Sequence, residues 1–481
     1  MKKMNLLVMS LVSAAALSFT SCSSNDDLAG NAGQEKVDGF YMTLNVQTPK
    51  SDGTRTVVNK PTEDATAAES DVTSGTIYLV DAAGKVVFKK EISEKEWKEG
   101  KPTQGKDGST QVKIEVEKVV VGATYKVYFL ANATDAKPWE NIFTATNKFA
   151  QPYDTDTKFA MFNQNDKDVK GNGYTVVFTD DNKKETSAAQ IKYNNAVSPI
   201  KIERLTARID EPTSNATQIV AYTKADAKPA EKKAMEDAIK KVGSIKMTGY
   251  AISNLSNKSY IMQNWTATTL NIPSDITYYQ PTKEFGTATL LENGNYFTAA
   301  TAPNTHKDYV FENYNDNAAT SMYFEYKVTL KEDAGKHKDF TDGTFYRYKN
   351  IIYTSFTDIK EAFKDVNDLF ENKAADALKK EVEDAKIATD SEAELDNIRR
   401  KYDIEIFNCG KTYYKQAIKD QYIGYENAIQ RNSIYRLTVN NIFNVGAQVP
   451  NGTPDKDGLF YLDVTVSVNP WVLNTQDVDF K

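Results

Sequence analysis

Short runs of alternating apolar and polar residues recur along this chain of 481 residues. In the run from Phe460 to Val468, every second residue is apolar. Successive side chains of a β-strand point to opposite faces, so a two-residue period predicts a strand with one buried face. Glycine and aspartate turns separate these runs at a density typical of antiparallel β-sandwiches. The pattern therefore predicts an all-β protein.

The length predicts two or three domains, and we expect two antiparallel β-sandwiches of the transthyretin-like or Greek-key kind. They should occupy residues 56–200 and 201–481. A content of 40% hydrophobic and 11% aromatic residues is enough for sizeable cores. The strands expected besides Phe460–Val468 are Thr76–Val80, Lys85–Ile92, Thr110–Val121, Thr124–Asn132, Tyr174–Thr179, Ile200–Asp210, Ser244–Asn254, Ser259–Gln263, Tyr296–Ala302, Met322–Lys331, Lys411–Ile418, Ser433–Asn441 and Val472–Phe480.

Two stretches of the second domain have helical spacing instead. Residues 224–243 carry an alanine and valine stripe and end at Gly243, where a C-cap glycine is common. Residues 357–402 are rich in charge, and Ser391 with Glu394 resembles a capping box. The apolar residues of this second stretch are Ile359, Phe363, Val366, Phe370, Leu378, Val382 and Ala385. We expect a helical hairpin packed against the sheet; a groove for a partner is the alternative.

The first residues have the order of an export signal. Lys2 and Lys3 precede an apolar run, Leu6 to Phe19, that is too short to span a bilayer permanently. Small residues then lead to Cys22, which resembles the lipobox of bacterial lipoproteins. In such proteins residues 1–21 are removed and the cysteine is acylated. A plain secretory peptide is the alternative.

The residues after Cys22 are polar and short of hydrophobic side chains, so Ser23 to Lys36 is expected to be a flexible tether. Asp26 and Asp27 resemble the surface-export signal of Bacteroidota lipoproteins, and a solvated linker is the alternative. Residues 22–55 would then form a lipidated propeptide.

Phe40 to Arg55 combines a strand with a loop. Four alternating apolar residues form one face of the strand: Phe40, Met42, Leu44 and Val46. A turn-forming stretch, Pro49 to Gly53, separates the strand from Arg55. This arrangement fits an ordinary first strand, and it also fits a strand that leaves the protein after cleavage.

Composition excludes several functions. A net charge of −7 argues against nucleic-acid binding. With Cys22 acylated, Cys409 has no disulfide partner, and neither His306 nor His337 has further ligands at metal spacing. No G-x-S-x-G motif or phosphate-binding glycine loop is present. We therefore expect no enzymatic activity, metal or cofactor.

Several motifs together resemble the fimbrillins of Bacteroidales, the type V pilins of long and short fimbriae. They occur in a characteristic order: the lipobox, the strand and loop of Phe40–Arg55, KIERLTARI at 201–209, GKTYY at 410–414, RNSIYRLTVNNI at 431–442 and LDVTVSVNPWVL at 462–473. The resemblance extends from Cys22 to Lys481. The helical stretch at 357–402 departs from it.

The resemblance implies a precursor lipoprotein of the outer membrane that matures at the cell surface. A trypsin-like protease would cut the bond between Arg55 and Thr56 and release the strand bearing Phe40, Met42, Leu44 and Val46. A C-terminal strand of the next subunit, within residues 459–481, would fill the gap. The donor residues implied are Phe460, Leu462, Val464, Val466, Val468, Trp471, Val478 and Phe480.

The leading function is therefore a structural subunit of a surface fimbrium that supports adhesion and biofilm formation. Its partners would be copies of itself, tip and anchor subunits, the protease, and host or bacterial surface receptors. The alternative is a tip or anchor subunit, or a surface lipoprotein, that binds glycan or protein. A hydrolase is the third hypothesis, and no motif supports it.

Overall fold

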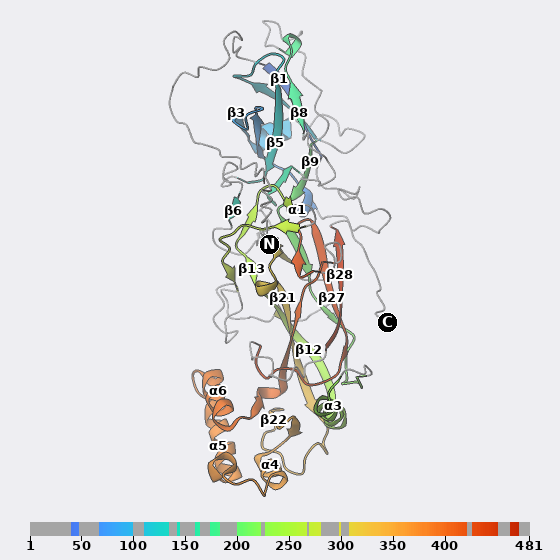
Figure 1. Cartoon of the computed structure of the whole chain (residues 1–481), viewed down its shortest axis with the longest axis vertical. Helices are drawn as coiled ribbons and strands as arrows, with labels where there is room; N and C mark the ends of the chain where they lie inside the picture. Colours follow the sequence, from blue (N-terminus) through green and yellow to red (C-terminus); the bar gives the residue numbers. More distant parts are fainter. Residues whose placement is uncertain are drawn as a thin grey trace, which may run out of the picture.

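We examined a computed structural model of the chain. It describes residues 40–47, 67–99, 110–133, 142–144, 159–163, 174–182, 200–222, 227–266, 269–279, 298–299, 307–420, 426–450 and 462–470. These residues form mostly β-strands in several sheets, with a few helices, and the molecule is elongated (Figure 1).

The strand Phe40–Gln47 (β1) lies inside the largest sheet, near one end of the molecule (Figure 1). It pairs antiparallel with β4 (Thr110–Val116) on one side and parallel with β9 (Ile200–Arg204) on the other. The order of the sheet is β3 (Val86–Ile92), β2 (Gly75–Val80), β5 (Thr124–Ala131), β7 (Met161–Asn163), β9, β1 and β4, and β8 (Thr175–Val177) also pairs with β5. β1 is therefore paired with β4 along nearly its whole length and with β9 at its C-terminal end.

One hydrophobic core covers this sheet. It contains the alternate apolar residues of β1, β4 and β5, as their two-residue period requires. Trp97 of the short helix α2 (Glu94–Glu99) stacks on Phe129 with ring centroids 5.4 Å apart. The ring of Phe159 packs against Tyr309 in a tilted arrangement, with centroids 4.7 Å apart. Since Tyr309 comes from a strand of the second sheet, this core continues into the junction between the two sheets.

Two further sheets make up the middle of the molecule. The first is ordered β11 (Thr213–Ser214), β27 (Ser433–Ile442), β10 (Thr206–Asp210) and β19 (Lys307–Phe311). A further strand, β28 (Leu462–Pro470), also pairs with β27. The second is ordered β18 (Thr298–Ala299), β12 (Val242–Ser253), β21 (Ser321–Leu330) and β25 (Lys411–Ala417). A second hydrophobic core, with Tyr326 and Tyr435 fully buried, includes residues of both sheets.

Small ladders complete the β structure. These pairs are β6 (Ile142–Thr144) with β14 (Lys258–Tyr260), β13 (Leu255–Ser256) with β17 (Tyr278–Tyr279), β15 (Asn264–Thr266) with β16 (Thr269–Asn271), and β20 (Asn313–Tyr314) with β26 (Ala428–Ile429).

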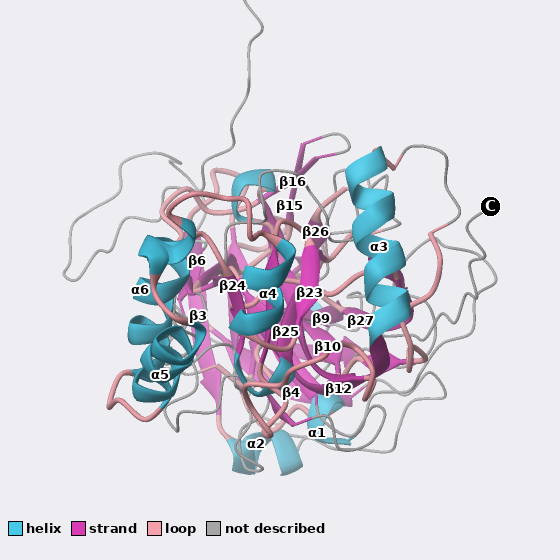
Figure 2. Cartoon of the chain, turned by 90° about the horizontal axis from the view of Figure 1, so that it is seen from below, coloured by secondary structure: helices cyan, strands magenta, loops and turns pink. Residues whose placement is uncertain are grey.

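A helical module with its own core occupies the end opposite β1 (Figure 1). It contains α4 (Phe356–Ala362), α5 (Ala375–Lys386), α6 (Ser391–Tyr402) and a small sheet of β23 (Ile351–Tyr353), β22 (Phe345–Tyr348) and β24 (Glu405–Phe407). Viewed from this end, α4 lies between α3 (Pro229–Lys241) and the α5–α6 pair (Figure 2). α5 and α6 form a helical hairpin within the predicted helical stretch 357–402, and α4 lies at the start of that stretch, whereas the small sheet was not predicted.

Some predictions need correction. The sheets are not purely antiparallel: β1 is parallel to β9, and β27 is parallel to β10 and β11. Strands that are distant in sequence can pair in either direction, whereas a hairpin enforces antiparallel pairing. Gly243 is not a helix cap, because α3 continues directly into β12 through Val242.

The helical stretch also differs in detail. Phe370 adopts a left-handed backbone conformation, and Val366 is 49% exposed, so neither continues the helical stripe. α6 is capped by Asp390, whose carboxylate accepts a hydrogen bond from the backbone N–H of Ala393, rather than by Ser391.

Candidate functional site

The face of β1 predicted to be buried is fully buried. Phe40, Met42, Leu44 and Val46 each have 0% exposure. The ring of Phe40 meets Phe178 edge to face, with centroids 5.5 Å apart. We call the space that these four side chains fill, together with the facing edges of β4 and β9, the β1 slot.

Emptying the β1 slot would expose both apolar surface and backbone. The register with β4 runs from Phe40 opposite Val116 to Val46 opposite Thr110, so β4 would lose its partner over its whole length. Burial of four such side chains stabilises the fold by about 6–12 kcal/mol, at about 1.5–3 kcal/mol each. Unpaired strand edges also bind other strands readily. An empty slot is therefore a strong acceptor for an extended segment.

The C-terminal strand β28 lies on an edge. It pairs antiparallel with β27, from Leu462 opposite Ile442 to Pro470 opposite Ser433. Val464 is half-buried against the second core, and Asn441 donates a hydrogen bond to Asp463 at 3.1 Å. Leu462, Val464, Val466 and Val468 thus belong to a described strand, whereas Phe460, Trp471, Val478 and Phe480 lie outside the described residues.

A continuous path of strands connects the β1 slot with β28. β9 borders the slot, and Leu205 alone separates it from β10. β10 pairs with β27, which in turn carries β28. The segment predicted as one long strand, Ile200–Asp210, thus crosses from the first sheet to the second. Every residue of this segment except Lys201 is buried.

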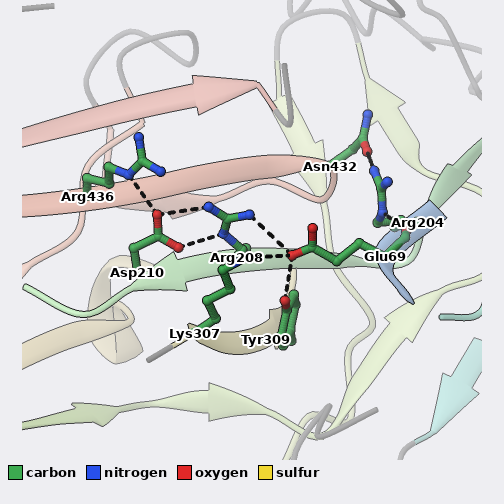
Figure 3. Close-up of polar contacts among 8 residues, drawn as sticks. All are labelled: Glu69, Arg204, Arg208, Asp210, Lys307, Tyr309, Asn432 and Arg436. Carbon is green, nitrogen blue, oxygen red and sulfur yellow. Dashed lines mark hydrogen bonds and ion pairs between the residues drawn. The ribbon is translucent and has the colours of Figure 1, made fainter. Parts of the chain in front are cut away.

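Buried charges hold this crossing together (Figure 3). Glu69, in the short helix α1 (Ala67–Ser70), accepts hydrogen bonds from Tyr309 at 2.6 Å and from Arg208 at 3.2 Å. Arg204 donates to the backbone oxygen of Glu69 at 2.5 Å and to Asn432 at 2.9 Å. Burial lowers the pKa of the Arg204 guanidinium, and Glu69 opposes that shift. Residues from β9, β10 and β19 thereby converge on α1, and Arg204 also connects α1 to Asn432, the residue before β27.

Asp210 extends the network toward β27. Arg208 forms two hydrogen bonds to its carboxylate, at 2.5 and 3.0 Å. Arg436 donates to the same carboxylate at 2.6 Å (Figure 3). Glu69, Arg208 and Asp210 are almost completely buried, with side-chain exposures of 0–1%. Desolvated charges of this kind are stable only while each keeps its partners.

We expect Arg208→Ala to destabilise the chain by about 3–5 kcal/mol, because it leaves the carboxylates of Glu69 and Asp210 buried with less compensation. The shift in the midpoint of chemical denaturation measures this effect. Lys98→Ala is the matched control. It breaks a surface pair with Glu94, both side chains being more than half exposed, and should change stability by less than about 1 kcal/mol. Equal effects of the two variants would contradict this assignment.

These buried charges were not predicted from the sequence. KIERLTARI was used only as a family motif, although the adjacent Glu203 and Arg204 place charges on both faces of a strand. Arg431 shows the same feature: it is fully buried, contacts Glu312 at 2.8 Å and lies 3.8 Å from Glu203. Charged residues are seldom fully buried unless they are paired, so no local sequence signal marks these positions as interior.

The remaining positions singled out from the sequence either lie outside the described residues or have only local contacts in the structure. Cys22, Arg55, Thr56 and His306 are outside the described residues. His337 contacts Asp358 at 2.6 Å. Burial raises the pKa of the Cys409 thiol.

The described residues contain no group of three or more potential metal-binding side chains. Within the same part of the chain, no helix is both long and apolar enough to cross a bilayer.

Comparison with known proteins followed. Residues 405–477, which run from β24 through β28, match the family model for the C-terminal region of fimbrillin, described as major fimbrial subunit protein type IV. Curated proteins gave no significant match.

Solved structures similar to this chain include a fimbrilin from Porphyromonas gingivalis W83, at 14% identity and a TM-score of 0.40, covering 91% of this chain and 98% of the other. A proposed cell adhesion protein from Parabacteroides distasonis ATCC 8503 has 13% identity and a TM-score of 0.46, covering 90% of this chain and 99% of the other.

The family match identifies the C-terminal part of the chain as that of a fimbrial subunit protein. The resemblance to fimbrillins predicted from the motifs is confirmed for this C-terminal region, residues 405–477.

Proposed function

We propose that this chain is a structural, non-enzymatic subunit of a cell-surface fimbrium that polymerises by donor-strand exchange. The observation that carries the proposal is the position of β1, fully buried between two strands yet connected to the next described element through the stretch that contains Arg55. Release of β1 opens a slot that a strand of another subunit fills. A head-to-tail contact of this kind does not close on itself and so produces filaments.

The distribution of arginine supports Arg55 as the processing site. The chain has eight arginines, and Arg204, Arg208, Arg347, Arg399 and Arg431 are buried. Arg436 is bonded to Asp210, and Arg400 lies in α6. Proteases cut extended, accessible segments, so these seven arginines are poor substrates in the folded chain. Lysines are far more numerous, and several are well exposed, such as Lys95 and Lys98. Both of these lysines lie in the helix α2, so the same argument protects them, and we propose Arg55 as the residue after which the trypsin-like protease cuts.

The precursor is proposed to reach the outer membrane as a lipoprotein acylated at Cys22. Until processing, β1 occupies the slot and keeps the subunit monomeric. The mature subunit, starting at Thr56, associates with other copies and with tip and anchor subunits. Adhesion to host or bacterial surfaces then follows from the assembled fimbrium. A separate glycan-binding role has little support, because the aromatic contacts of the first sheet lie inside its core.

The test is the N-terminal sequence of the protein sheared from the cell surface. A start at Thr56 supports removal of β1. An acylated start at Cys22 on all of the surface protein would mean that β1 is retained. The chain would then be an anchor subunit or a lipoprotein that does not polymerise.

A further inference from the structure

One face of the sheet that contains β12, β21 and β25 carries three lysines in direct register. Lys246 of β12 lies opposite Lys327 of β21, and Lys327 in turn lies opposite Lys411 of β25. All three are exposed, whereas Tyr326 and Val328, which point to the other face, lie in the second core. Directly opposed residues of an antiparallel pair share a face, with Cβ atoms about 4.5–5.5 Å apart. We call these three residues the lysine row.

The lysine row is unfavourable for the isolated sheet, because like charges directly opposite each other destabilise a strand pair. Lys411 has a counter-charge, since its ammonium lies 3.1 Å from the nearly buried carboxylate of Glu325. Within the described part of the chain, Lys246 and Lys327 form no ion pair. Two positive charges of the row therefore remain for a partner with acidic groups.

The segment that joins α5 to α6 has the opposite charge. From Glu383 to Glu394 it reads EDAKIATDSEAE, with five acidic residues and one lysine, Lys386, which already bonds to Asp342. Ile387 in the same segment is 83% exposed, more than any other large hydrophobic side chain among the described residues. We call residues 383–394 the acidic tip. It presents one apolar side chain among carboxylates.

The acidic tip lies beside the lysine row on the same subunit, toward the end opposite β1 (Figure 1). Asn408, three residues before Lys411, donates a hydrogen bond to Glu392 at 3.2 Å. Tyr413 lies opposite Glu325, in the row of residues next to the lysine row. Burial raises the pKa of the Tyr413 hydroxyl, and the charges of Glu325 and Glu392 add to this shift. A positive patch and a negative patch are therefore neighbours.

We propose that the lysine row of one subunit binds the acidic tip of a second copy in a neighbouring filament, with the same contact made in the reverse direction. Neighbouring patches of opposite sign make such a surface self-complementary, because each copy supplies both partners. The apolar stems of the lysines would cover Ile387 while their ammonium groups meet the carboxylates. A polyanion of another kind would pair with the lysine row but would leave the acidic tip without a partner. The inference rests on the proposed function, because the contact is repeated along a filament.

Repetition gives this contact its strength. An exposed ion pair contributes little by itself. A filament carries one lysine row and one acidic tip per subunit, so after the first contact the others form at a high effective concentration. The net charge of −7 makes two copies repel each other at a distance. About 0.1 M salt screens that repulsion beyond about 10 Å and spares touching charges, whereas about 1 M salt shortens the screening length to about 3 Å.

Low-speed sedimentation of filaments sheared from the cell surface tests the contact, because bundles pellet and single filaments do not. Lys246→Glu with Lys327→Glu reverses the sign of the lysine row. Asp384→Lys with Glu394→Lys reverses charges of the acidic tip, at two exposed positions. A chain with all four substitutions has an acidic row and a basic tip, so its charges are complementary again. Restored pelleting of this chain separates a lost contact from a misfolded subunit.

We expect wild-type filaments to pellet at about 0.1 M salt and to disperse at about 1 M. The row reversal and the tip reversal should each abolish the pellet, and the combined exchange should restore it. Lys95→Glu with Lys98→Glu is the matched control, because these α2 lysines are 83% and 65% exposed and their reversal changes the net charge as the row reversal does. This control should pellet like the wild type.

Other outcomes would overturn the inference. If the row reversal abolishes the pellet and the tip reversal does not, the lysine row binds a different anion. Pelleting that survives both reversals, or that the α2 control also loses, would show that the two patches are not the contact. Failure of the proposed function would look different, because no filaments would form from any of these chains. The soluble wild-type chain should then still self-associate with rising concentration in sedimentation velocity, and the row-reversed chain should not; equal behaviour of the two would also overturn the inference.

Discussion

Arg55→Ala is expected to abolish polymerisation while leaving a folded, lipidated precursor. The substitution removes the proposed cleavage site but changes no residue of β1, so the slot stays filled by Phe40, Met42, Leu44 and Val46. While β1 fills the slot, the strand edges that face it are paired and its apolar surface is buried, so a donor strand cannot bind there. Electron microscopy of the cell surface, with immunoblots of sheared material, measures the loss of filaments.

Two further variants make this test specific. Arg55→Lys should also block maturation if the protease selects arginine. Arg400→Ala, on the exposed face of α6, should leave assembly unchanged because, among the described residues, that arginine bonds to Asp396 and Asn397 of its own helix. Abundant filaments of normal length from Arg55→Ala would show that cleavage occurs elsewhere or is not needed.

The energetics of β1 link processing to assembly. Its four buried side chains contribute about 6–12 kcal/mol by area arguments. A typical domain has a net stability of only about 5–15 kcal/mol. A processed subunit with an empty slot is therefore close to unfolding, and a donor strand restores what β1 supplied. Under the proposed function, cleavage would therefore convert a stable monomer into a subunit whose stable state is the polymer.

The sequence predicted the buried face of β1 correctly but not the position of β1 in the sheet. Alternation shows which residues of a strand face a core, and all four were found at 0% exposure. The neighbours of β1 are β4 and β9, and the latter begins at Ile200. Pairing across such a separation depends on the whole topology, and no local pattern encodes it.

The helical module shows a second case in which the spacing of apolar residues does not predict the local structure. Leu378, Val382 and Ala385 are buried along α5, as their spacing predicts. Phe370 has the same spacing from Val366 but lies in a left-handed turn and still enters the module's core. Apolar residues recur at helical spacing wherever a chain folds over a core, so the pattern alone does not separate a helix from consecutive turns.

Truncation after Leu459 is expected to give a subunit that accepts a donor strand but cannot provide one. The deletion removes all of the proposed donor, including Phe460, Leu462, Val464 and Val466, and leaves the slot residues and the Arg55 site intact. It also leaves one edge of β27 unpaired, so some loss of stability is expected. Alone, the processed truncation should form no long polymers. Mixed with wild-type subunits, it should end filaments and shorten them in proportion to its share, as measured by electron microscopy.

A second truncation, after Pro470, is the matched control, because it keeps β28 and removes Trp471, Val478 and Phe480. If β28 is the donor, this chain should still polymerise, and the two truncations then bracket the donor between residues 460 and 470. Loss of polymers from both truncations would mean that the donor, or an essential part of it, lies within the last eleven residues. Long homopolymers from the Leu459 truncation would mean that a different segment fills the slot. The free C-terminal strand would then serve only to cover β27.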